Sequence, residues 1–421
     1  MKPQAPEAFA ALIGLDWADA KHDVCLQAAG SERREFLVLE HSPEAIDAWV
    51  QTLRTRFHGQ PVAVCLELNK GPIVSALRQY DFLVLFPVNP FTLAKYREAF
   101  TPSRAKDDPT DAELQVELLL KHRDKLTPLT PQSPTMRALA QLVEHRRRLV
   151  GDKVRCTNRL TSALKNYFPH VLQWFQEKDT GIFCDFLSRW PTLKAAQLAR
   201  RTTLEHFFRE HHVRSADVIK TRIEAIKSAV ALTTDAGVIT PNALLVQALV
   251  AQLRVTLQAI ADFDKAIAPL AQGHPDFPLF DALPGAGAVF APRLLVAFGE
   301  QRERFTSAED LQKYAGIAPV TERSGKKSWV HWRLQCPKFL RQTFVEWAAE
   351  STRHSFWAQV YYQQQRDNGK AHQAAVRALA FKWLRILYRC WQDRTPYNES
   401  VYLNALNRRG SSLIQNLAKE S

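Results

Sequence analysis

The first ninety residues carry the two-residue alternation and short apolar runs that are typical of β-strands. The expected strands are residues 12–17, 22–28, 34–39, 61–68 and 82–88. Apolar residues at helical spacing predict helices over 42–57 and 71–78, between the later strands. Strands that first follow one another and then alternate with helices predict a mixed α/β sheet, because a purely doubly wound sheet would alternate throughout.

Most of the remaining chain has the periodicity of helices, and this part begins after the proline-rich stretch T-P-L-T-P-Q-S-P at 127–134. Two long helices are expected over 135–167 and 242–267, and their leucine stripes would let them pair as an antiparallel coiled coil. Between them, residues 170–240 contain helical fragments whose order the pattern does not give. Further helices are expected over 289–298, 307–314, 337–351 and 371–392.

The segments predict an architecture of α/β plus α type in four parts. The parts are a mixed-sheet domain of the ribonuclease-H type over 1–128, a coiled-coil-like helical domain with an insertion over 129–274, a mostly helical domain over 275–400 and a tail over 401–421. A dinucleotide-binding fold is unsupported, because no G-x-G-x-x-G motif follows a strand.

Composition adds a partner class and a compartment. The chain has 421 residues and a formal net charge of +13, and nucleic acid is the commonest partner of so basic a protein. The six cysteines are scattered without a C-x-x-C pair, which argues against a zinc site or disulfide framework and for a reducing cytosol. The start of the chain does not resemble a signal peptide, and we expect no apolar run as long as a membrane span.

Acids within apolar strands are the first candidate chemistry. Asp16 ends the first expected strand and Glu67 ends the fourth, and burying a carboxylate is costly unless it is paired or bound to a metal. In D-D-P-T-D, Pro109 suits a first helical turn, so Asp108 is the expected N-cap and Asp111 the N3 residue. Alone this is a capped helix. Together the four carboxylates suit Mg²⁺ or Mn²⁺, which can act at a phosphodiester; scattered structural acids are the alternative.

Basic stretches support a nucleic-acid partner. The segment from Arg323 to Arg341 holds six Lys or Arg residues and no acid, and basic side chains neutralise phosphates. Its aromatic residues could stack on unpaired bases or belong to the core; they are Trp329, Trp332 and Phe339. A second basic run comprises Arg146, Arg147 and Arg148, on a helix face that could be solvated or could contact a nucleic-acid backbone. In L-P-G-A-G, Gly285 and Gly287 suit a helix-hairpin-helix turn that approaches a phosphate, or an ordinary Pro-Gly turn.

Several motifs, in order and spacing, resemble the insertion-sequence-110 family of transposases. G-L-D-W-A-D-A-K-H-D, C-L-E-L and K-D-D-P-T-D-A resemble the family's Asp-Glu-Asp-Asp signature, and L-P-G-A-G, Y-A-G-I-A-P and R-S-G-K-K resemble its second conserved domain. The resemblance implies a first domain similar to the RuvC junction resolvase. It implies that the metal ligands are Asp16, Glu67, Asp108 and Asp111.

The resemblance also implies a serine nucleophile, which matches Ser324 in T-E-R-S-G-K-K. Its basic neighbours would hold a phosphate; they are Arg323, Lys326 and Lys327. Ser328, in the same loop, is the main rival. Read from the residues alone, the segment is a basic Ser-Gly turn at the surface.

Three acids near the candidate set are assigned other roles. Asp19 and Asp23 lie close to Asp16, but neither ends a strand, so we expect exposed turn and strand-edge carboxylates. The family spacing Asp-x-x-Asp-Ala selects Asp108, which leaves Asp107 as a neighbour.

The resemblance implies an RNA-guided DNA recombinase of bacterial cytoplasm, located at the nucleoid when it is bound to DNA. Its partners would be donor and target DNA, a noncoding bridge RNA, and further copies of the chain in a homodimer or homotetramer with composite active sites. Strand exchange would pass through a phosphoserine–DNA intermediate. Two alternatives stay open: a metal-dependent junction nuclease without a covalent intermediate, and a basic RNA-binding protein without catalysis.

Overall fold

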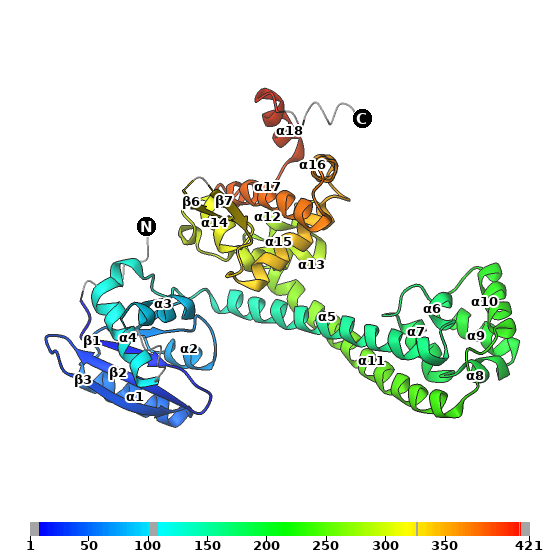
Figure 1. Cartoon of the computed structure of the whole chain (residues 1–421), viewed down its shortest axis with the longest axis horizontal. Helices are drawn as coiled ribbons and strands as arrows, with labels where there is room; N and C mark the ends of the chain where they lie inside the picture. The colour runs from blue at the N-terminus through cyan, green and yellow to red at the C-terminus, as the bar shows by residue number, and fades with distance from the viewer. Residues whose placement is uncertain (1–7, 101–107, 326, 412, 414–421) are drawn as a thin grey trace. The chain divides into compact units, whose positions relative to one another are not determined.

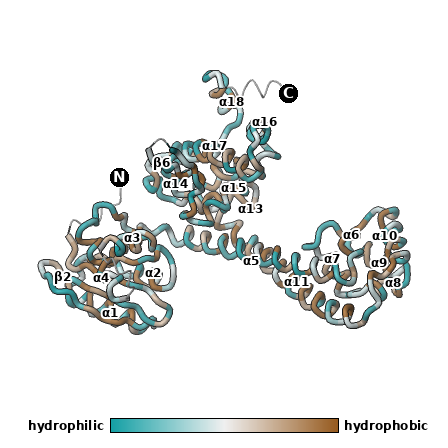
Figure 2. Tube along the Cα trace, viewed as in Figure 1, coloured by the Kyte–Doolittle hydropathy of each residue, from teal (hydrophilic) through white to brown (hydrophobic). Residues whose placement is uncertain are grey.

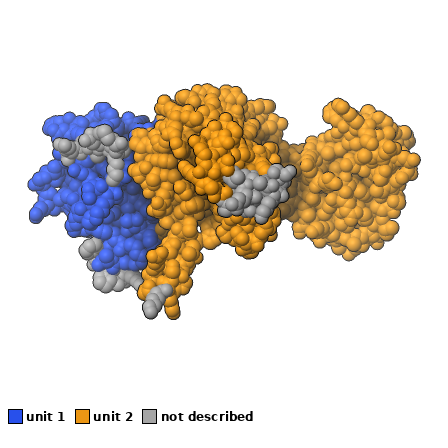
Figure 3. All heavy atoms as spheres, turned by 90° about the horizontal axis from the view of Figure 1, so that it is seen from above, with its two compact units in different colours: residues 1–132 blue, residues 133–421 orange. Residues whose placement is uncertain are grey.

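The computed structural model describes residues 8–100, 108–325, 327–411 and 413. The chain divides into two compact units, Met1–Gln132 and Ser133–Ser421 (Figure 3). The division falls inside the proline-rich stretch at 127–134, where few apolar residues are available to continue either core. Each unit has hydrophobic clusters of its own.

Unit 1 contains a five-stranded mixed sheet. Its strands are β1 (Ala11–Asp16), β2 (Lys21–Ala28), β3 (Arg34–Glu40), β4 (Val62–Leu66) and β5 (Leu83–Pro87). The strand order is β3-β2-β1-β4-β5, in which β1, β2 and β3 pair antiparallel and β4 and β5 run parallel to β1. All five expected strands are confirmed to within two residues at each end. The mixed α/β sheet is confirmed too, and it follows from the alternation that the sequence shows.

Helices cover both faces of this sheet. α1 (Pro43–Arg56) and α2 (Pro72–Leu77) share one hydrophobic cluster with β1 and β4. α3 (Pro90–Phe100) and α4 (Asp108–His122) contribute residues such as Leu93 and Leu118 to clusters on the other face, with a short 3₁₀ helix η1 (Arg123–Lys125) after α4. α4 begins at Asp108 itself, so this residue is the first helical residue and not the expected N-cap before it.

In unit 2, α5 (Pro134–Tyr167) and α11 (Ala236–Gln272) lie side by side (Figure 1). They run antiparallel: the start of α5 meets the end of α11 where Arg146 forms an ion pair with Asp264, and the end of α5 meets the start of α11 where Asn166 donates to Asn242. The predicted antiparallel pairing is confirmed. α11 begins six residues before the expected start at 242, because Pro241 lies within the helix and does not end it.

Five short helices form the insertion between α5 and α11. They are α6 (Val171–Trp174), α7 (Gly181–Arg189), α8 (Leu193–Leu198), α9 (Arg201–Glu210) and α10 (Ala216–Ser228). Their core is aromatic, with Phe186 in contact with Trp174, Phe175, Trp190 and Phe207. Helices this short are held by contacts between them rather than by their own periodicity, which is why the sequence pattern did not order them.

The last part of unit 2 is a helical bundle with a β-hairpin. Its elements are α12 (Phe277–Asp281), α13 (Gly287–Phe298), η2 (Arg302–Arg304), α14 (Ala308–Tyr314), β6 (Val320–Ser324), β7 (Lys327–His331), α15 (Lys338–Ser351), α16 (Phe356–Asp367), α17 (His372–Gln392) and α18 (Glu399–Arg408). Buried tryptophans such as Trp347, Trp357 and Trp383 fill its core. The expected tail from 401 is helical as far as Arg408, because Tyr402 of α18 packs on Trp357.

The long-helix part and the bundle share one core. Met136 and Leu139 of α5 and Ile267 of α11 belong to the same hydrophobic cluster as the helices of the bundle. The paired helices therefore end in two separate cores of unit 2, that of the insertion and that of the bundle.

One described helix, α11, is long and apolar enough to cross a membrane by length and composition. This corrects the expectation that no apolar run reaches that length. Figure 2 shows hydrophobic positions recurring along α11, and one side of the helix packs on α5, as Val246, Leu249 and Leu253 are buried. Helices in protein cores pass the same test, so the length carries no further conclusion.

Candidate active site

The carboxyl ends of two parallel strands bring two of the predicted acids to one edge of the sheet. β1 ends at Asp16, β4 ends at Leu66, and Leu15 is aligned with Leu66. Glu67 therefore follows β4 at the level where Asp16 ends β1. Both acids are half-buried. In open α/β sheets the carboxyl ends of strands are where ligands usually bind, so the pair lies where chemistry is expected.

Helix α4 packs closely on β1 because β1 contains a glycine. A Cβ at Gly14 would overlap the carbonyl oxygen of Ala112. The buried Gln115 side chain accepts a hydrogen bond from the Leu15 backbone N–H at 2.7 Å. Strand residues two apart point to the same face, so Asp16 and Gly14 share the face that α4 covers. The end of β1 and the start of α4 therefore meet on one face of the sheet.

Asp111 forms an ion pair with Arg97, a residue that the sequence pattern did not single out. Only 2% of Asp111 is exposed. Nη2 of Arg97, on α3, lies 2.7 Å from its Oδ1 and 2.8 Å from its Oδ2. Arg97 thus supplies the counter-charge that a buried carboxylate requires. No pattern around Arg97 pointed to this role, because the contact depends on how α3 and α4 pack.

The strand register places two further residues, Cys65 and Asp23, next to Glu67 and Asp16. Burial raises the pKa of the Cys65 thiol, and the nearby Glu67 carboxylate raises it further; Cys65 lies on the same face as α4. Asp23 is directly opposite Asp16 in the β1–β2 register and is half-buried. Asp23 is thus less exposed than expected, because β2 lies between β1 and β3. Asp19 is exposed, as expected.

The predicted metal ligands are of the right chemical type, but the described residues do not bring them together as a metal-binding cluster. Carboxylate oxygens are ligands that Mg²⁺ and Mn²⁺ prefer. Within residues 8–100, 108–325, 327–411 and 413, no group of three or more His, Cys, Asp or Glu side chains is arranged to hold a metal ion. Asp108 starts α4, but its side chain and the whole of Asp107 lie outside what the structure describes. The structure thus brings Asp16, Glu67 and the start of α4 to the same part of unit 1.

Ser324 stands at the end of β6, next to the tip of an exposed hairpin (Figure 1). Ser324 pairs with Lys327, the first residue of β7. Gly325 follows with a φ of 57°, the left-handed conformation that a tight hairpin turn requires and that glycine adopts without strain. Lys326 lies outside the described residues. The hydroxyl of Ser324 is therefore carried on a tight turn with a lysine across the strand pair.

The register of the hairpin separates the two candidate serines. Ser324 shares its face with Lys327, its cross-strand partner, whereas Arg323 pairs with Ser328 on the opposite face. Ser324 and Ser328 therefore cannot present their hydroxyls to one phosphate from the same face. Arg323 is exposed, but it flanks Ser328 more directly than it flanks Ser324.

A glycine before the hairpin and two arginine hydrogen bonds after it fix the base of the hairpin. α14 is followed by Gly316, with a φ of 71°, and a Cβ at this position would overlap the Cys336 side chain. Arg333 Nε donates to the carbonyl oxygen of Ala318 at 3.4 Å, and Arg341 Nη1 donates to that of Arg333 at 3.1 Å. The glycine of Y-A-G-I-A-P thus allows the chain to pass close to the segment that follows the hairpin.

The predicted basic run on α5 is partly engaged within unit 2. Arg146 forms an ion pair with Asp264 and is 17% exposed. Arg147 bonds Glu144, which raises the pKa of its guanidinium, and also donates to Gln342. Arg148 forms a longer ion pair with Glu144, at 3.4 Å, and its side chain is 62% exposed. Of the three, Arg148 is the one that extends into solvent.

The glycines of L-P-G-A-G differ in their surroundings. Gly285 has a φ of 68°, and a Cβ there would lie 2.7 Å from Cδ2 of His354, so packing accounts for this glycine. Gly287, with a φ of 47°, begins α13, has open space around it and is exposed. The N-cap residue Ala286 makes no side-chain hydrogen bond to the α13 amides, and amides at a helix start suit an anion.

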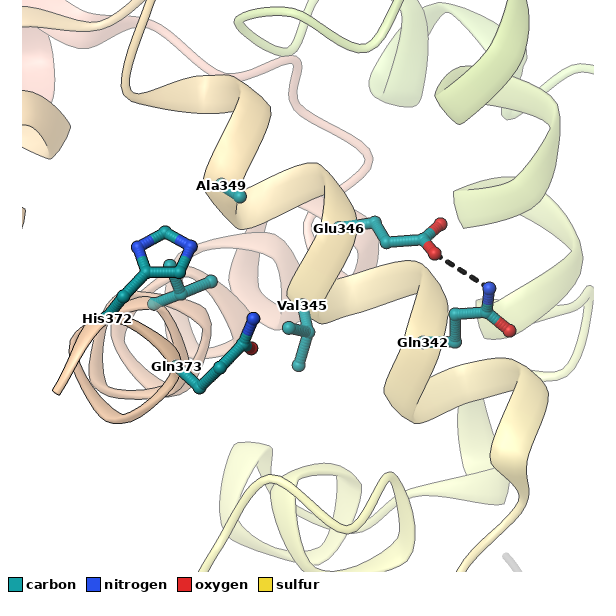
Figure 4. Close-up of a pocket in the computed structure, with 7 residues that line it drawn as sticks. Gln342, Val345, Glu346, Ala349, His372 and Gln373 are labelled. Atoms are coloured by element: carbon teal, nitrogen blue, oxygen red, sulfur yellow. Dashed lines mark hydrogen bonds between the residues drawn. The ribbon is translucent and has the colours of Figure 1, made fainter. Parts of the chain in front are cut away.

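A surface hollow lies on α15 and α17, and one of its lining residues, Gln342, accepts a hydrogen bond from Arg147. Gln342 donates to Glu346 at 2.7 Å, and Figure 4 shows both side chains beside the hollow. Its lining residues are Gln342, Val345, Glu346, Ala349, His372, Gln373 and Val376. Glu346 is also paired with the buried Arg293 at 2.7 Å. Gln342 and Glu346 are thus already used in bonds that join α15 to α5 and α13.

Two family models match the chain over the regions that hold these features. One is described as a transposase model and matches residues 13–169, which include the sheet and α4. The other is described as the transposase IS116/IS110/IS902 family and matches residues 278–363, which include the hairpin. The two regions that hold the candidate acids and the candidate serine thus match transposases, which are enzymes of DNA recombination. The chain belongs to the IS110 family of insertion-sequence transposases.

Individual relatives agree with this assignment. The mini-circle putative transposase for IS117 of Streptomyces coelicolor is 28% identical over 93% of this chain and 96% of its own length. The uncharacterized 43.6 kDa protein of insertion element IS110, from the same organism, is 25% identical over 71% of this chain and 74% of its own. The pilin gene-inverting protein of Moraxella bovis is 28% identical over 46% of this chain and 58% of its own.

Proposed function

We propose that the chain excises and inserts an insertion sequence by a serine-dependent strand transfer that a noncoding bridge RNA guides. The observation that carries the proposal is the placement of Ser324 beside the tip of an exposed, basic hairpin. A nucleophile for a DNA phosphate must be accessible to a chain as wide as a nucleic acid, and every residue of β7 and all but the first of β6 are exposed.

In the proposed reaction, the Oγ of Ser324 attacks a DNA phosphorus. The bond from phosphorus to the 3′-oxygen breaks, a phosphoserine ester forms, and the 3′-oxygen leaves as a hydroxyl. The serine proton is released to water as the leaving oxygen takes one up. Lys327, paired with Ser324, is positioned to neutralise the phosphate, and Arg323 and Lys326 add positive charge to the same turn.

We assign the acids of unit 1 to a divalent-metal site with a RuvC-like role. The ligands would be Asp16, Glu67, Asp108 and Asp111, with Mg²⁺ or Mn²⁺ as the ion. A metal bound there would neutralise charge at the phosphate being cleaved. The strand order β3-β2-β1-β4-β5 and the edge shared by Asp16 and Glu67 support this assignment. Arg97 holds the Asp111 carboxylate in place.

Further contacts to donor and target DNA and to the RNA are assigned to basic and open positions outside the turn. Arg148 and the open start of α13 at Gly287 suit backbone phosphates. Arg146, Arg147 and Gly285 would act indirectly, because internal contacts occupy them. None of these contacts reads bases. A guide RNA would supply sequence recognition, which agrees with the lack of a recognisable base-reading motif in the sequence.

The proposed assembly is a homodimer or homotetramer with composite sites. The serine and the acids lie in different units of the chain, so a site that combines them can draw each from a different protomer. α11 offers a surface for a second copy: Leu244 and Val255 are 68% and 71% exposed, and Ala248 and Ala251 between them are exposed too. Spacings of four, three and four residues are those of a coiled-coil stripe.

The proposal is tested by trapping the covalent intermediate. DNA carrying the element's ends, incubated with the protein and its RNA and then denatured, should leave a protein–DNA adduct that Ser324→Ala abolishes. Ser328→Ala is the matched control and should retain the adduct, since its hydroxyl lies on the opposite face of the hairpin. An adduct that survives Ser324→Ala but not Ser328→Ala would transfer the role to Ser328. Strand cleavage by the Ser324→Ala protein would instead indicate a nuclease that uses water.

A further inference from the structure

The β6–β7 hairpin has large apolar side chains but no core of its own. Trp329 is 44% exposed and Val330 69% exposed. A two-stranded hairpin is at best marginally stable alone, and the Arg333 and Arg341 bonds to backbone carbonyls hold its base. The exposed Trp329 and Val330 make this hairpin a candidate binding surface.

The two tryptophans near the hairpin differ in what covers their rings. Trp329 and Trp332 are equally exposed, at 44% each. The Trp332 ring is covered by the guanidinium of Arg377, 3.1 Å from the ring centroid, and Arg341 lies 5.8 Å from it. Among the side chains that the structure describes, no ring or cation stacks on Trp329. Trp329 therefore keeps a π-face available, whereas the ring of Trp332 is already engaged.

The available ring lies on the face of Ser324. Trp329 is the cross-strand partner of Glu322, two residues from Ser324, and follows two residues after Lys327, the partner of Ser324. Residues two apart on a strand share a face and are about 7 Å apart. A base adjacent to a phosphate at Ser324 is thus within reach of the Trp329 ring.

The positive charge of the hairpin favours binding of a nucleic-acid strand. Lys327 on the Ser324 face and Arg323 on the other are both exposed and basic. The one acid of the strand pair, Glu322, is matched by His331 at 3.4 Å. Positive groups along a ribbon neutralise phosphates, and an aromatic ring beside them stacks on unpaired bases.

We infer that Trp329 stacks on an unpaired DNA base next to the phosphate that Ser324 attacks. This inference rests on the proposed function: the bound strand is taken to be DNA because Ser324 is proposed to attack a DNA phosphate. Stacking would hold the base out of the duplex and align its phosphate with the hydroxyl. Trp329 is then a binding and positioning residue, and Ser324 alone is the nucleophile.

The test uses a single-stranded DNA oligonucleotide that contains one 2-aminopurine, whose fluorescence falls when the base is stacked. The wild-type protein should quench the probe. Trp329→Ala should remove the quenching and weaken binding roughly tenfold, whereas Trp329→Phe, which keeps a π-face, should lose less than about threefold. Trp332→Ala is the matched control of equal exposure and should stay within about twofold of the wild type.

Each result bears on the inference. Wild-type binding by Trp329→Ala, or an equal loss with Trp332→Ala, would overturn the assignment to Trp329. Binding of an RNA probe of the same sequence more than tenfold more tightly than the DNA would overturn DNA as the occupant. If the Trp329→Ala loss is found while Ser324→Ala still forms an adduct, the stacking stands and the nucleophile is wrong. If Ser324→Ala abolishes the adduct while Trp329→Ala binds normally, Ser324 is the nucleophile and the stacking by Trp329 is wrong.

Discussion

At the scale of single residues, buried polar groups decide how unit 1 holds its chemistry. Asp111 is almost fully buried and is paired with Arg97. Gln115, also buried, uses its side-chain oxygen to bond Leu15 in the strand next to it. Each of these groups would be costly without its partner. Asp111 was predictable as a candidate from the helix start in D-D-P-T-D. The contacts that Arg97 and Gln115 make were not predictable, since neither residue carries a sequence signal of a contact on another element.

A second buried pair makes the stability of unit 1 sensitive to pH. His22 is fully buried, and burial and the neighbouring His41 lower its pKa to about 4. The Ala18 backbone N–H donates to Nδ1 of His22 at 3.3 Å, so the ring proton is on Nε2, which donates to Nδ1 of His41 at 2.9 Å. Protonation of His22 at Nδ1 would place its N–H against the Ala18 N–H, so that two donors would face each other without an acceptor.

We predict that unit 1 loses stability as the pH falls from about 6.5 to about 4. In this range the unfolded chain takes up a proton at His22 and the folded chain does not, so the free energy of unfolding decreases with falling pH, by at most about 3 kcal/mol. Hydrogen exchange of β2 amides, measured across this range, follows the loss. His22→Gln removes the titration and should flatten the dependence; an unchanged slope in this variant would assign the effect to another group.

At the scale of elements, the site depends on how closely α4 approaches β1. The approach is possible because position 14 has no side chain, and the carbonyl oxygen of Ala112 occupies the space that a Cβ would take. Since a backbone atom is what lies there, no side-chain rotation can relieve the overlap. The hairpin shows the same dependence at Gly316, whose missing side chain makes room for Cys336.

We predict that Gly14→Ala separates α4 from β1. Overpacking of this kind costs about 2 kcal/mol, which corresponds to roughly thirtyfold faster local hydrogen exchange. Mass spectrometry should locate the increase in peptides of α4 and β1, with α5 and α11 unaffected. Gly181→Ala is the control, because a Cβ at Gly181 meets nothing within 4 Å. Unchanged exchange in α4 after Gly14→Ala would show that the helix can shift without loss.

At the scale of the whole molecule, the candidate acids and the candidate serine lie in two different compact units of the chain. Unit 2 continues through the paired helices, so its long axis is formed by α5 and α11 and not by a flexible linker. Such a helix pair suits an assembly of several protomers, because it presents a long, ordered surface. In the proposed assembly, a second copy would cover the exposed apolar stripe on α11 from Leu244 to Val255.

We predict that the double change Leu244→Glu and Val255→Glu weakens self-association. Both side chains are exposed in the single chain, so the fold should be retained, whereas a charge placed in an apolar interface should raise the dissociation constant roughly tenfold or more. Analytical ultracentrifugation measures this constant. Leu198→Glu, at a residue 75% exposed on α8, is the control and should have no effect. An assembly that is unaltered by the double change would place the interface elsewhere.

The hydrophobic pattern by itself determined the strands of the sheet, the two long helices and their pairing, because each of these follows from local periodicity. It also singled out Asp16 and Glu67 as acids within apolar strands, while the helix start in D-D-P-T-D drew attention to Asp108 and Asp111. Ser324 was expected from the family resemblance alone. Only the tertiary structure decided what surrounds them. The pairing of Asp111 with Arg97, the contact at Gly14 and the open ring of Trp329 depend on contacts between elements, and local periodicity does not encode such contacts.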